Sequence, residues 1–295
     1  MMRCKTLLPA ALALMFFTLP NRGLAQTPPP ASYTENGFTP QLLDTALPRA
    51  ERMKLFANMV ALANSGQVRA QDLAGTLLWL GPKVAGSPVP VNLDLARKLL
   101  ANAAINGDVT AMAKLAELEL AAGRPPQAMV WAQLYARYLD PLALQRQPRG
   151  RKAAYASNLI GRIQKAGGHI DDTTRTRVAA MVSRFDQRIR RGFDAMAAQR
   201  RSGKVYLTTG PMGVDPLDML NRNGIAEYMM AFDSSGAPQR IWNLDAFPDP
   251  AMASELRHYL DHVRANTAHA GSGLRFLRVT IVHEARRGRI LRPVH

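Results

Sequence analysis

The sequence has almost no cysteine. Cys4 is the single one among 295 residues, and it lies in a first segment whose basic start leads into an apolar run at 6–20. This pattern, with small residues before Gln26, is typical of a secretory signal cleaved after Ala25. The mature chain would then contain no thiol, which excludes disulfides, iron–sulfur clusters and thiol catalysis.

Long hydrophobic runs are also lacking. The apolar run at 6–20 is shorter than the roughly 20 residues that a membrane-spanning helix needs. Retention of this segment as an uncleaved anchor is therefore the alternative, and cleavage is the prediction. We expect a periplasmic or secreted protein.

Acidic residues are few. The chain has 38 Lys and Arg against 22 Asp and Glu, and loss of residues 1–25 would lower the formal charge from +16 to +13. A basic soluble protein would ordinarily suggest nucleic acid as a partner. Because export argues against nucleic acid, we expect an acidic protein partner, or an anionic surface of the cell envelope.

Motifs that carry chemistry are missing too. The glycine-containing segment 207–213 lacks the lysine of a phosphate-binding loop. His258 and His262 are four residues apart on a predicted helix, a spacing that lets two imidazoles share a metal. The glutamate that zinc hydrolases place beside the first histidine is replaced by Tyr259. We expect no cofactor, no metal and no enzymatic activity, and a metal-dependent hydrolase is the weakest alternative.

A helical period is present in the segment 94–139. Apolar residues recur at helical spacing, and the runs end at Gly107 and Gly123, with Asp108 placed to cap the second helix. Small alanines alternate with large residues, as two nested antiparallel helices require. The segment therefore predicts an array of helical hairpins. The residues of the pattern are Leu95, Leu99, Ala103, Ala104, Ala111, Leu115, Leu118, Ala122, Ala128, Trp131, Ala132, Tyr135 and Tyr138.

This pattern resembles the Sel-one-like repeat, a relative of the tetratricopeptide repeat. The resemblance covers about 67–144, and Ala96 and Ala128 occupy equivalent places 32 residues apart. It implies an α-solenoid scaffold for protein–protein contact, with no catalytic residue. Since stable arrays usually need at least about three repeats, other helices are expected to cap it.

Such arrays bind partners along the surface formed by the first helix of each hairpin. In this sequence the resemblance implies contacts from Arg97 and Asn102 on one helix, and from Gln133 and Arg137 on another. The helical part is expected to carry the main protein contact, with an acidic partner surface.

A basic segment follows the repeats. Residues 146–204 contain fifteen Lys and Arg against four Asp, and 171–201 predicts one long amphipathic helix. Its basic face would include Arg175, Arg184, Arg188 and Arg191. The simpler interpretation is a solvated outer face of a capping helix, and the other is a site for anionic lipid or polysaccharide.

The period changes after residue 205. The order is strand, strand, helix, strand, with a turn at Asp233 to Gly236 and a helix predicted over 249–266. This order packs as a small sheet with one helix on its face. It resembles the carboxy-terminal domain of TonB-type proteins, which implies that an edge strand, within 238–244 or 290–291, pairs with a partner peptide.

The sequence thus predicts a mainly α fold, an α-solenoid of helical hairpins followed by a small α+β domain. The expected organisation is a signal peptide (1–25), a Pro-rich linker (26–47), a helical-repeat domain with a basic capping helix (48–201), and the α+β domain (202–295). The oligomeric state and the identity of the partner stay open.

Overall fold

A computed structural model describes residues 40–144, 154–168, 171–202, 207–209, 223–265, 275–284 and 287–291. All of these belong to one unit of the chain, 33–295. The expected signal peptide and most of the linker lie outside the described residues. The longer helices are α1 (Arg49–Asn64), α2 (Val68–Leu80), α3 (Leu93–Ile105), α4 (Val109–Ala121), α5 (Pro125–Leu144), α6 (Ala154–Gly167) and α7 (Asp172–Ser202).

The helices from α1 to α6 pack as successive hairpins, each against the next. Gly107 and Gly123 end α3 and α4 with positive φ angles of 95° and 69°, which glycine adopts without strain. The Asp108 carboxylate accepts hydrogen bonds from the backbone N–H groups of Thr110 (3.0 Å) and Ala111 (3.1 Å) at the start of α4. The predicted helical hairpins, their ends at Gly107 and Gly123 and the cap at Asp108 are confirmed.

The end of α5 differs from the prediction. The predicted helical period stops at residue 139, just before Asp140 and Pro141, but α5 continues through Pro141 to Leu144. A proline removes one backbone hydrogen bond and disfavours the preceding turn, yet its cost of about 3 kcal/mol does not always end a helix. The α5 helix buries Leu134, Tyr138 and other side chains on several neighbours, and this packing outweighs the local preference.

The last part of the chain forms an antiparallel sheet. The strands are β1 (Leu207–Thr209), β2 (Gly224–Phe232), β3 (Pro238–Phe247), β4 (Val263–Ala265), β5 (Arg275–Glu284) and β6 (Arg287–Leu291). The main sheet has the order β3-β2-β5-β6, and β1 pairs with β4. Asp233 forms the predicted turn between β2 and β3, since its carboxylate accepts from the N–H groups of Ser235 (2.8 Å) and Ala237 (3.0 Å). Both predicted edges, β3 and β6, are edge strands.

Both faces of the central strand β2 are buried. Ile225 and Met229 join the core of the helical layer. Tyr228 and Met230 pack on the other face, in a cluster with the short helix α8 (Met252–Leu256). The expectation of a sheet with one helix on its face is therefore incomplete, because the helical hairpins cover the second face.

The helix predicted over 249–266 is also shorter than expected. Asp249 accepts from the N–H of Ala251 (2.9 Å), and α8 is then replaced by a 3-10 helix, η4 (Arg257–His262), and by strand β4. Leu260 and Val263 are nonetheless fully buried. Pairing of β4 with β1 ends the helix, a contact that the local sequence does not reveal.

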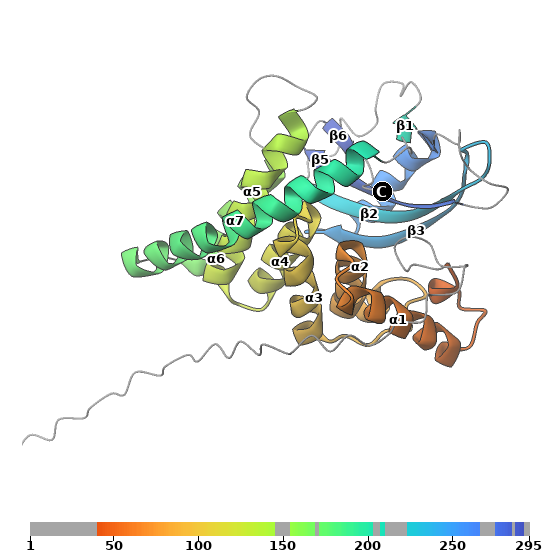
Figure 1. Ribbon diagram of the computed structural model, residues 1–295, viewed down its shortest axis with the longest axis horizontal. Coiled ribbons are helices and arrows are strands. Elements are labelled where there is room, and N and C mark those ends of the chain that lie inside the picture. Colours follow the sequence, from red (N-terminus) through yellow and green to blue (C-terminus); the bar gives the residue numbers. More distant parts are fainter. Residues whose placement is uncertain are drawn as a thin grey trace, which may run out of the picture. The chain divides into compact units, whose positions relative to one another are not determined.

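Helices of alternate number face opposite sides of the helical layer. The long helix α7 contacts α3 and α5, whereas the sheet contacts α2 through β3 and α6 through β5. Figure 1 shows α7 running across the helical layer and the sheet beside it. The hairpins are thus enclosed between one long helix and one sheet.

Candidate functional site

A cluster of charged side chains is buried where α2 and α4 meet the sheet. Lys114 is fully buried, and its Nζ lies 3.2 Å from each Asp72 carboxylate oxygen and 2.6 Å from the Thr76 hydroxyl. It also donates to Glu227 of β2. Arg278 of β5 donates to Glu227 at 2.7 Å and pairs with Asp72.

These charged groups shift one another's pKa values. Burial opposes the charge of Glu227, but Arg278 and Lys114 outweigh it and hold its pKa at about 2. For Asp72 burial prevails over the same two cations and raises the pKa to about 6. Two cations and two carboxylates therefore compensate each other in a buried site, as buried charges require.

Asp245 of β3 is the odd member of this cluster. It lies opposite Glu227 in the sheet register, is 3% exposed, and its Oδ2 has no hydrogen-bond partner among the described residues. Burial and the nearby charges of Glu227 and Asp72 raise its pKa to about 8, although Lys114 acts in the opposite direction. Perturbed carboxyls often mark active sites, but neither hollow described below reaches this one. Its contacts favour a structural role, holding sheet and helices together.

The helix α7 is seated firmly on α3 and α5. Trp131 stacks on Phe185 with ring centroids 5.4 Å apart, and the Tyr138 hydroxyl donates to the Asp186 carboxylate at 2.8 Å. A Cβ added at Gly192 would lie 2.4 Å from the backbone carbon of Asn106. The two backbones therefore approach each other as closely as glycine permits.

This seating uses part of the surface predicted to hold a partner. Arg137, 53% exposed, pairs with Asp186 of α7 at 3.0 Å, and Arg97 pairs with Glu119 at 2.7 Å and with Asp94 at 2.8 Å. Asn102 is exposed, and Gln133 is half-buried. The structure thus places α7 on the same helices, α3 and α5, that supply these four residues.

The predicted basic face of α7 is exposed, but not as one stripe. Arg184, Arg188 and Arg191 lie on one side of the helix, while Arg175 pairs with Asp172 at 2.6 Å on another. Arg177 extends the first three at helical spacing, although it was not among the predicted residues. Its signal was present, since intervals of seven, four and three residues return to nearly the same angle of an α-helix.

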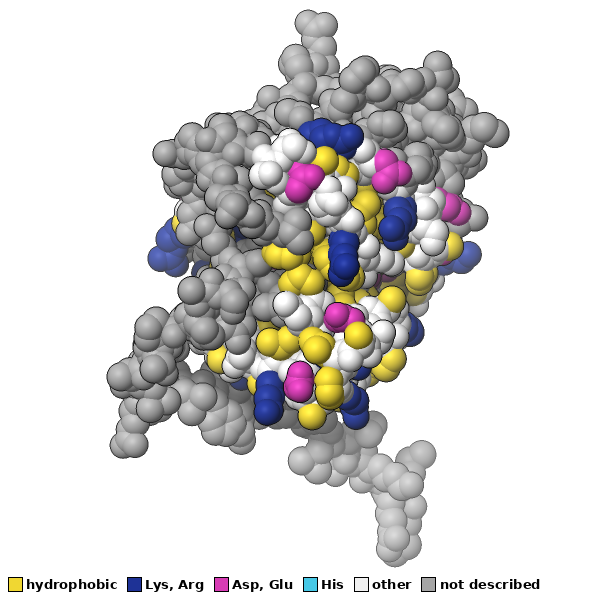
Figure 2. All heavy atoms as spheres, turned by 90° about the vertical axis from the view of Figure 1, so that its right-hand side faces the viewer, with side chains coloured by type: hydrophobic (Ala, Val, Ile, Leu, Met, Phe, Trp, Pro, Cys, Tyr) yellow, Lys and Arg dark blue, Asp and Glu magenta, His cyan; other side chains and the backbone are white. Residues whose placement is uncertain are grey.

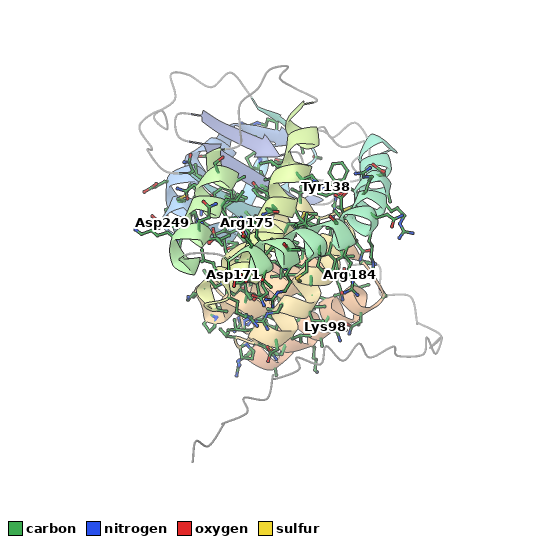
Figure 3. The ribbon with its side chains drawn as sticks, turned by 90° about the vertical axis from the view of Figure 1, so that its left-hand side faces the viewer. Lys98, Tyr138, Asp171, Arg175, Arg184 and Asp249 are labelled. Atoms are coloured by element: carbon green, nitrogen blue, oxygen red, sulfur yellow. The ribbon has the colours of Figure 1, made fainter. Side chains whose placement is uncertain are left out.

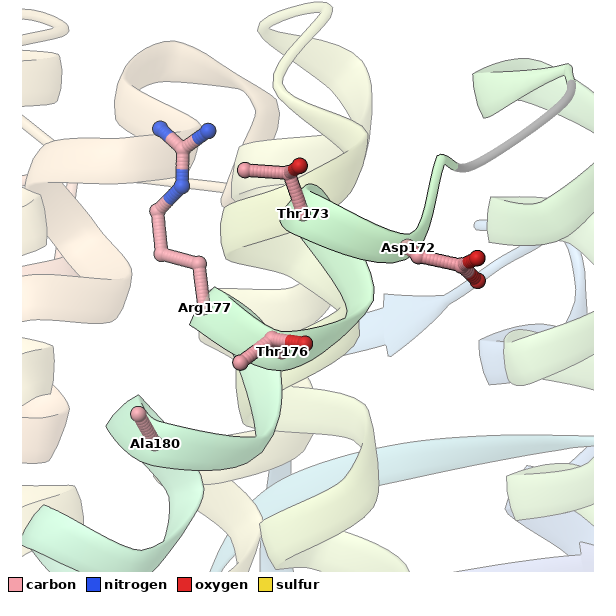
Figure 4. A pocket seen from close by; sticks show the side chains of 5 residues that line it. All are labelled: Asp172, Thr173, Thr176, Arg177 and Ala180. Carbon is pink, nitrogen blue, oxygen red and sulfur yellow. The ribbon is translucent and has the colours of Figure 1, made fainter.

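The hollows of the described surface are shallow. One of about 560 Å³ is open and lined only by the first turns of α7, where Arg177 points away from Asp172 (Figure 4). Another, of about 100 Å³, lies between α7 and the start of α5. Neither has the enclosed apolar walls typical of a small-molecule site. On the right-hand side of Figure 1, acidic and basic side chains are interspersed among hydrophobic ones (Figure 2).

The two histidines proposed for a metal, His258 and His262, lie on the 3-10 helix η4 instead of the predicted α-helix. Residues four apart are about 120° apart on a helix with three residues per turn, against about 40° on an α-helix. Their side chains are not described. Within the described ranges, no group of three His, Cys, Asp or Glu residues could hold a metal ion.

None of the helices in the described part of the chain is both long and apolar enough to cross a membrane. No family model, curated protein or solved structure matches the chain. The contacts and charges described above are therefore the basis for assigning a function.

Proposed function

We propose that this protein is an exported, non-enzymatic scaffold of the bacterial envelope that binds an acidic protein. The successive hairpins and their glycine ends support the Sel-one-like, tetratricopeptide-type assignment. The strand order after the helices is compatible with a TonB-like carboxy-terminal module, in which an edge strand could take a second peptide.

One observation carries this proposal: α7 buries an apolar face against the helical layer and exposes a basic face. Val178, Val182 and Ile189 are buried against the helical layer. The opposite face exposes arginines, and the helix contains eight arginines and no lysine. Because the apolar face is already occupied, the surface left for a partner is basic. A complementary partner is therefore acidic.

Site-specific photo-crosslinking in whole cells tests the scaffold. A photoreactive residue replacing Gln187, exposed on α7 beside the arginines, is expected to give a discrete protein adduct. The same residue replacing Ala57, exposed on α1, serves as the control. Absence of any protein adduct from position 187, with the protein present in the envelope, would contradict the proposal.

Export is tested separately by the mass of the mature chain. We expect an amino terminus at or near Gln26 in the periplasm. Full-length protein that includes Met1 and stays in the inner membrane would rule out cleavage and favour an anchored form.

A second function is favoured by the same arginines: binding of anionic lipid or polysaccharide at an envelope surface. Such binding is electrostatic, because the apolar face of α7 is buried and does not reach a bilayer. It is expected to weaken strongly between low and physiological salt. Binding to anionic vesicles that persists at physiological salt would exclude this electrostatic mechanism.

A further inference from the structure

A row of arginines runs along one side of α7. Arg177, Arg184, Arg188 and Arg191 are all exposed, and at about 100° per residue their side chains fall within about 60° of one another. Asp186, which binds Tyr138 of α5, lies on the opposite side of the helix by the same geometry. We call these four residues the arginine row.

Three residues of the arginine row have no acidic partner among the described residues. Within the described residues, Arg177, Arg188 and Arg191 form no ion pair. Two acids of α7 are engaged elsewhere, since Asp172 pairs with Arg175, and Asp186 pairs with Arg137 and Arg190. The third acid, Asp194, follows Arg191 by three residues, and it forms no ion pair with the described residues. The guanidinium groups of Arg177, Arg188 and Arg191 thus have no carboxylate partner among the described residues, and they can each pair with an external anion.

A lysine of the neighbouring helix adds to this surface. Lys98 of α3 is exposed, and α3 contacts α7. The two helices meet closely at Asn106 and Gly192. Figure 3 shows Lys98 and Arg184 on the same face. The positive surface therefore extends from α7 onto α3.

The length of the row fits a short extended peptide. From Arg177 to Arg191 the helix rises about 21 Å, which equals about six or seven residues of extended chain. The three intervals of the row rise about 10.5, 6 and 4.5 Å, about 7 Å on average, and side chains on one edge of an extended peptide repeat about every 6.6–7 Å. Carboxylates at alternate positions therefore match the average spacing of the row, and the long arginine side chains span the unequal intervals.

We infer that the arginine row, with Lys98, binds an extended acidic polypeptide segment. This inference rests on the proposed function and names the chemistry of its partner. Guanidinium groups pair with carboxylates through two parallel hydrogen bonds, which gives a line of arginines more selectivity than a line of lysines. A bilayer would meet this single helix only along one narrow line, with no apolar face available for insertion.

The test uses the whole mature chain, 26–295, and a labelled eight-residue peptide of alternating Glu and Ser. Fluorescence anisotropy measures binding at about 25 mM salt and at physiological salt. The variant Arg188→Gln/Arg191→Gln removes two charges from the row. The matched control, Arg175→Gln/Arg190→Gln, removes two charges from other sides of the same helix.

We expect the row variant to weaken peptide binding at least about fivefold and the control to weaken it less than about twofold. Equal losses from both variants would overturn the inference, because net charge alone would then explain binding. Vesicles containing anionic lipid form the second arm. Vesicle binding that depends on the row, without peptide binding, would overturn it as well. A protein adduct at position 187 in cells, without peptide affinity, would sink this inference but leave the scaffold standing.

Discussion

Lys114 is fully buried, and the two carboxylates that neutralise it come from different layers of the molecule, Asp72 from a helix and Glu227 from the sheet. A buried charge that loses its partner costs several kcal/mol, although replacing a whole buried pair with apolar residues is often neutral. The consequence at the residue scale is that each member of this cluster depends on the others.

Lys114→Met is expected to lower the free energy of unfolding by about 3–5 kcal/mol, since it leaves Asp72 and Glu227 with Arg278 as their single cation. Denaturant titration measures this loss. Lys98→Met, an exposed lysine on α3, is the control and is expected to change stability by less than about 0.5 kcal/mol.

The double variant Lys114→Met/Glu227→Gln separates the loss of the charge balance from the loss of packing. It leaves one cation, Arg278, and one carboxylate, Asp72, and is expected to recover about 1 kcal/mol or more of the stability lost in the single variant. Additive losses in the double variant would show that charge balance is not what Lys114 supplies.

Asp245→Asn is expected to stabilise the protein, and more strongly as the pH rises. The carboxyl has a folded-state pKa of about 8 against an ordinary value of 3.8, so folding takes up a proton between these two values. The contribution of the Asp245 carboxyl to the free energy of unfolding is fully present below about pH 4 and is lost as the pH rises toward 8. The Asn amide has the same shape as the Asp carboxyl and does not titrate, so the variant does not lose this stability as the pH rises.

At pH 8 we expect the free energy of unfolding of the Asn variant to exceed that of the wild type by about 1–3 kcal/mol, with a smaller difference at pH 5. Chemical denaturation at both values measures this, and Asp194→Asn on the exposed part of α7 is the control. A variant less stable than the wild type at both pH values would mean that the Asp245 carboxylate is needed in its charged form.

At the element scale, α7 packs tightly on the helical layer and is an integral part of the fold. Its contact with α3 depends on Gly107 and Gly192, where added Cβ atoms would lie 2.3 Å and 2.4 Å from backbone atoms of the opposite element. Aromatic contacts of Phe185 with Trp131 and of Phe193 with Tyr138 follow along α5. The face that helical-repeat proteins often offer to partners is here filled by the chain itself.

Gly192→Ala tests this contact. Alanine favours a helix over glycine, but the added methyl group would meet the backbone of Asn106. We expect a net loss of about 1–3 kcal/mol from the forced separation of α3 and α7. Thermal unfolding gives the stability, and tryptophan fluorescence, compared with and without the additional change Trp131→Phe, reports the local change where Trp131 stacks on α7.

Gly161→Ala on α6 is the matched control for that substitution. An added Cβ at Gly161 would meet nothing within 4 Å, so the helix preference of alanine is expected to raise stability by about 0.5–1 kcal/mol. If both alanine variants were stabilised, the close approach of α3 and α7 would not be rigid.

At the scale of the whole molecule, the helices and the sheet share a core. One cluster of buried apolar side chains contains helical residues together with Ile225, Met229 and Phe247 of the sheet. The ionic cluster joins the same layers. The helical part and the small α+β part are therefore held together by non-covalent packing as well as by the chain that connects them.

We expect the fragment 26–202 to unfold without a cooperative transition, whereas the chain 26–295 unfolds in one. The fragment would expose the apolar surface that the sheet covers and would leave Lys114 without Glu227. Circular dichroism during heating, together with binding of a hydrophobic dye, measures both effects. Cooperative unfolding of the fragment near the temperature of the whole chain would show instead that the helical layer is independent.

The local sequence determined the helices, their hairpins and their ends. Apolar spacing, the glycines at 107 and 123 and the Asp108 cap are interactions between residues within a few positions of each other, which is why sequence alone predicts them. The amphipathic pattern of α7 and the turn at Asp233 belong to the same class.

Tertiary structure decided which other elements each of these helices and strands contacts. Nothing near Glu227 in the sequence indicates that its partners are Lys114 and Arg278, which are 113 and 51 residues away. The continuation of α5 through Pro141 and the replacement of a long helix by η4 and β4 likewise depend on packing and strand pairing between distant segments. Whether an arginine face is free or covered is a property of the assembled layers, because only the assembly determines which side of α7 is buried.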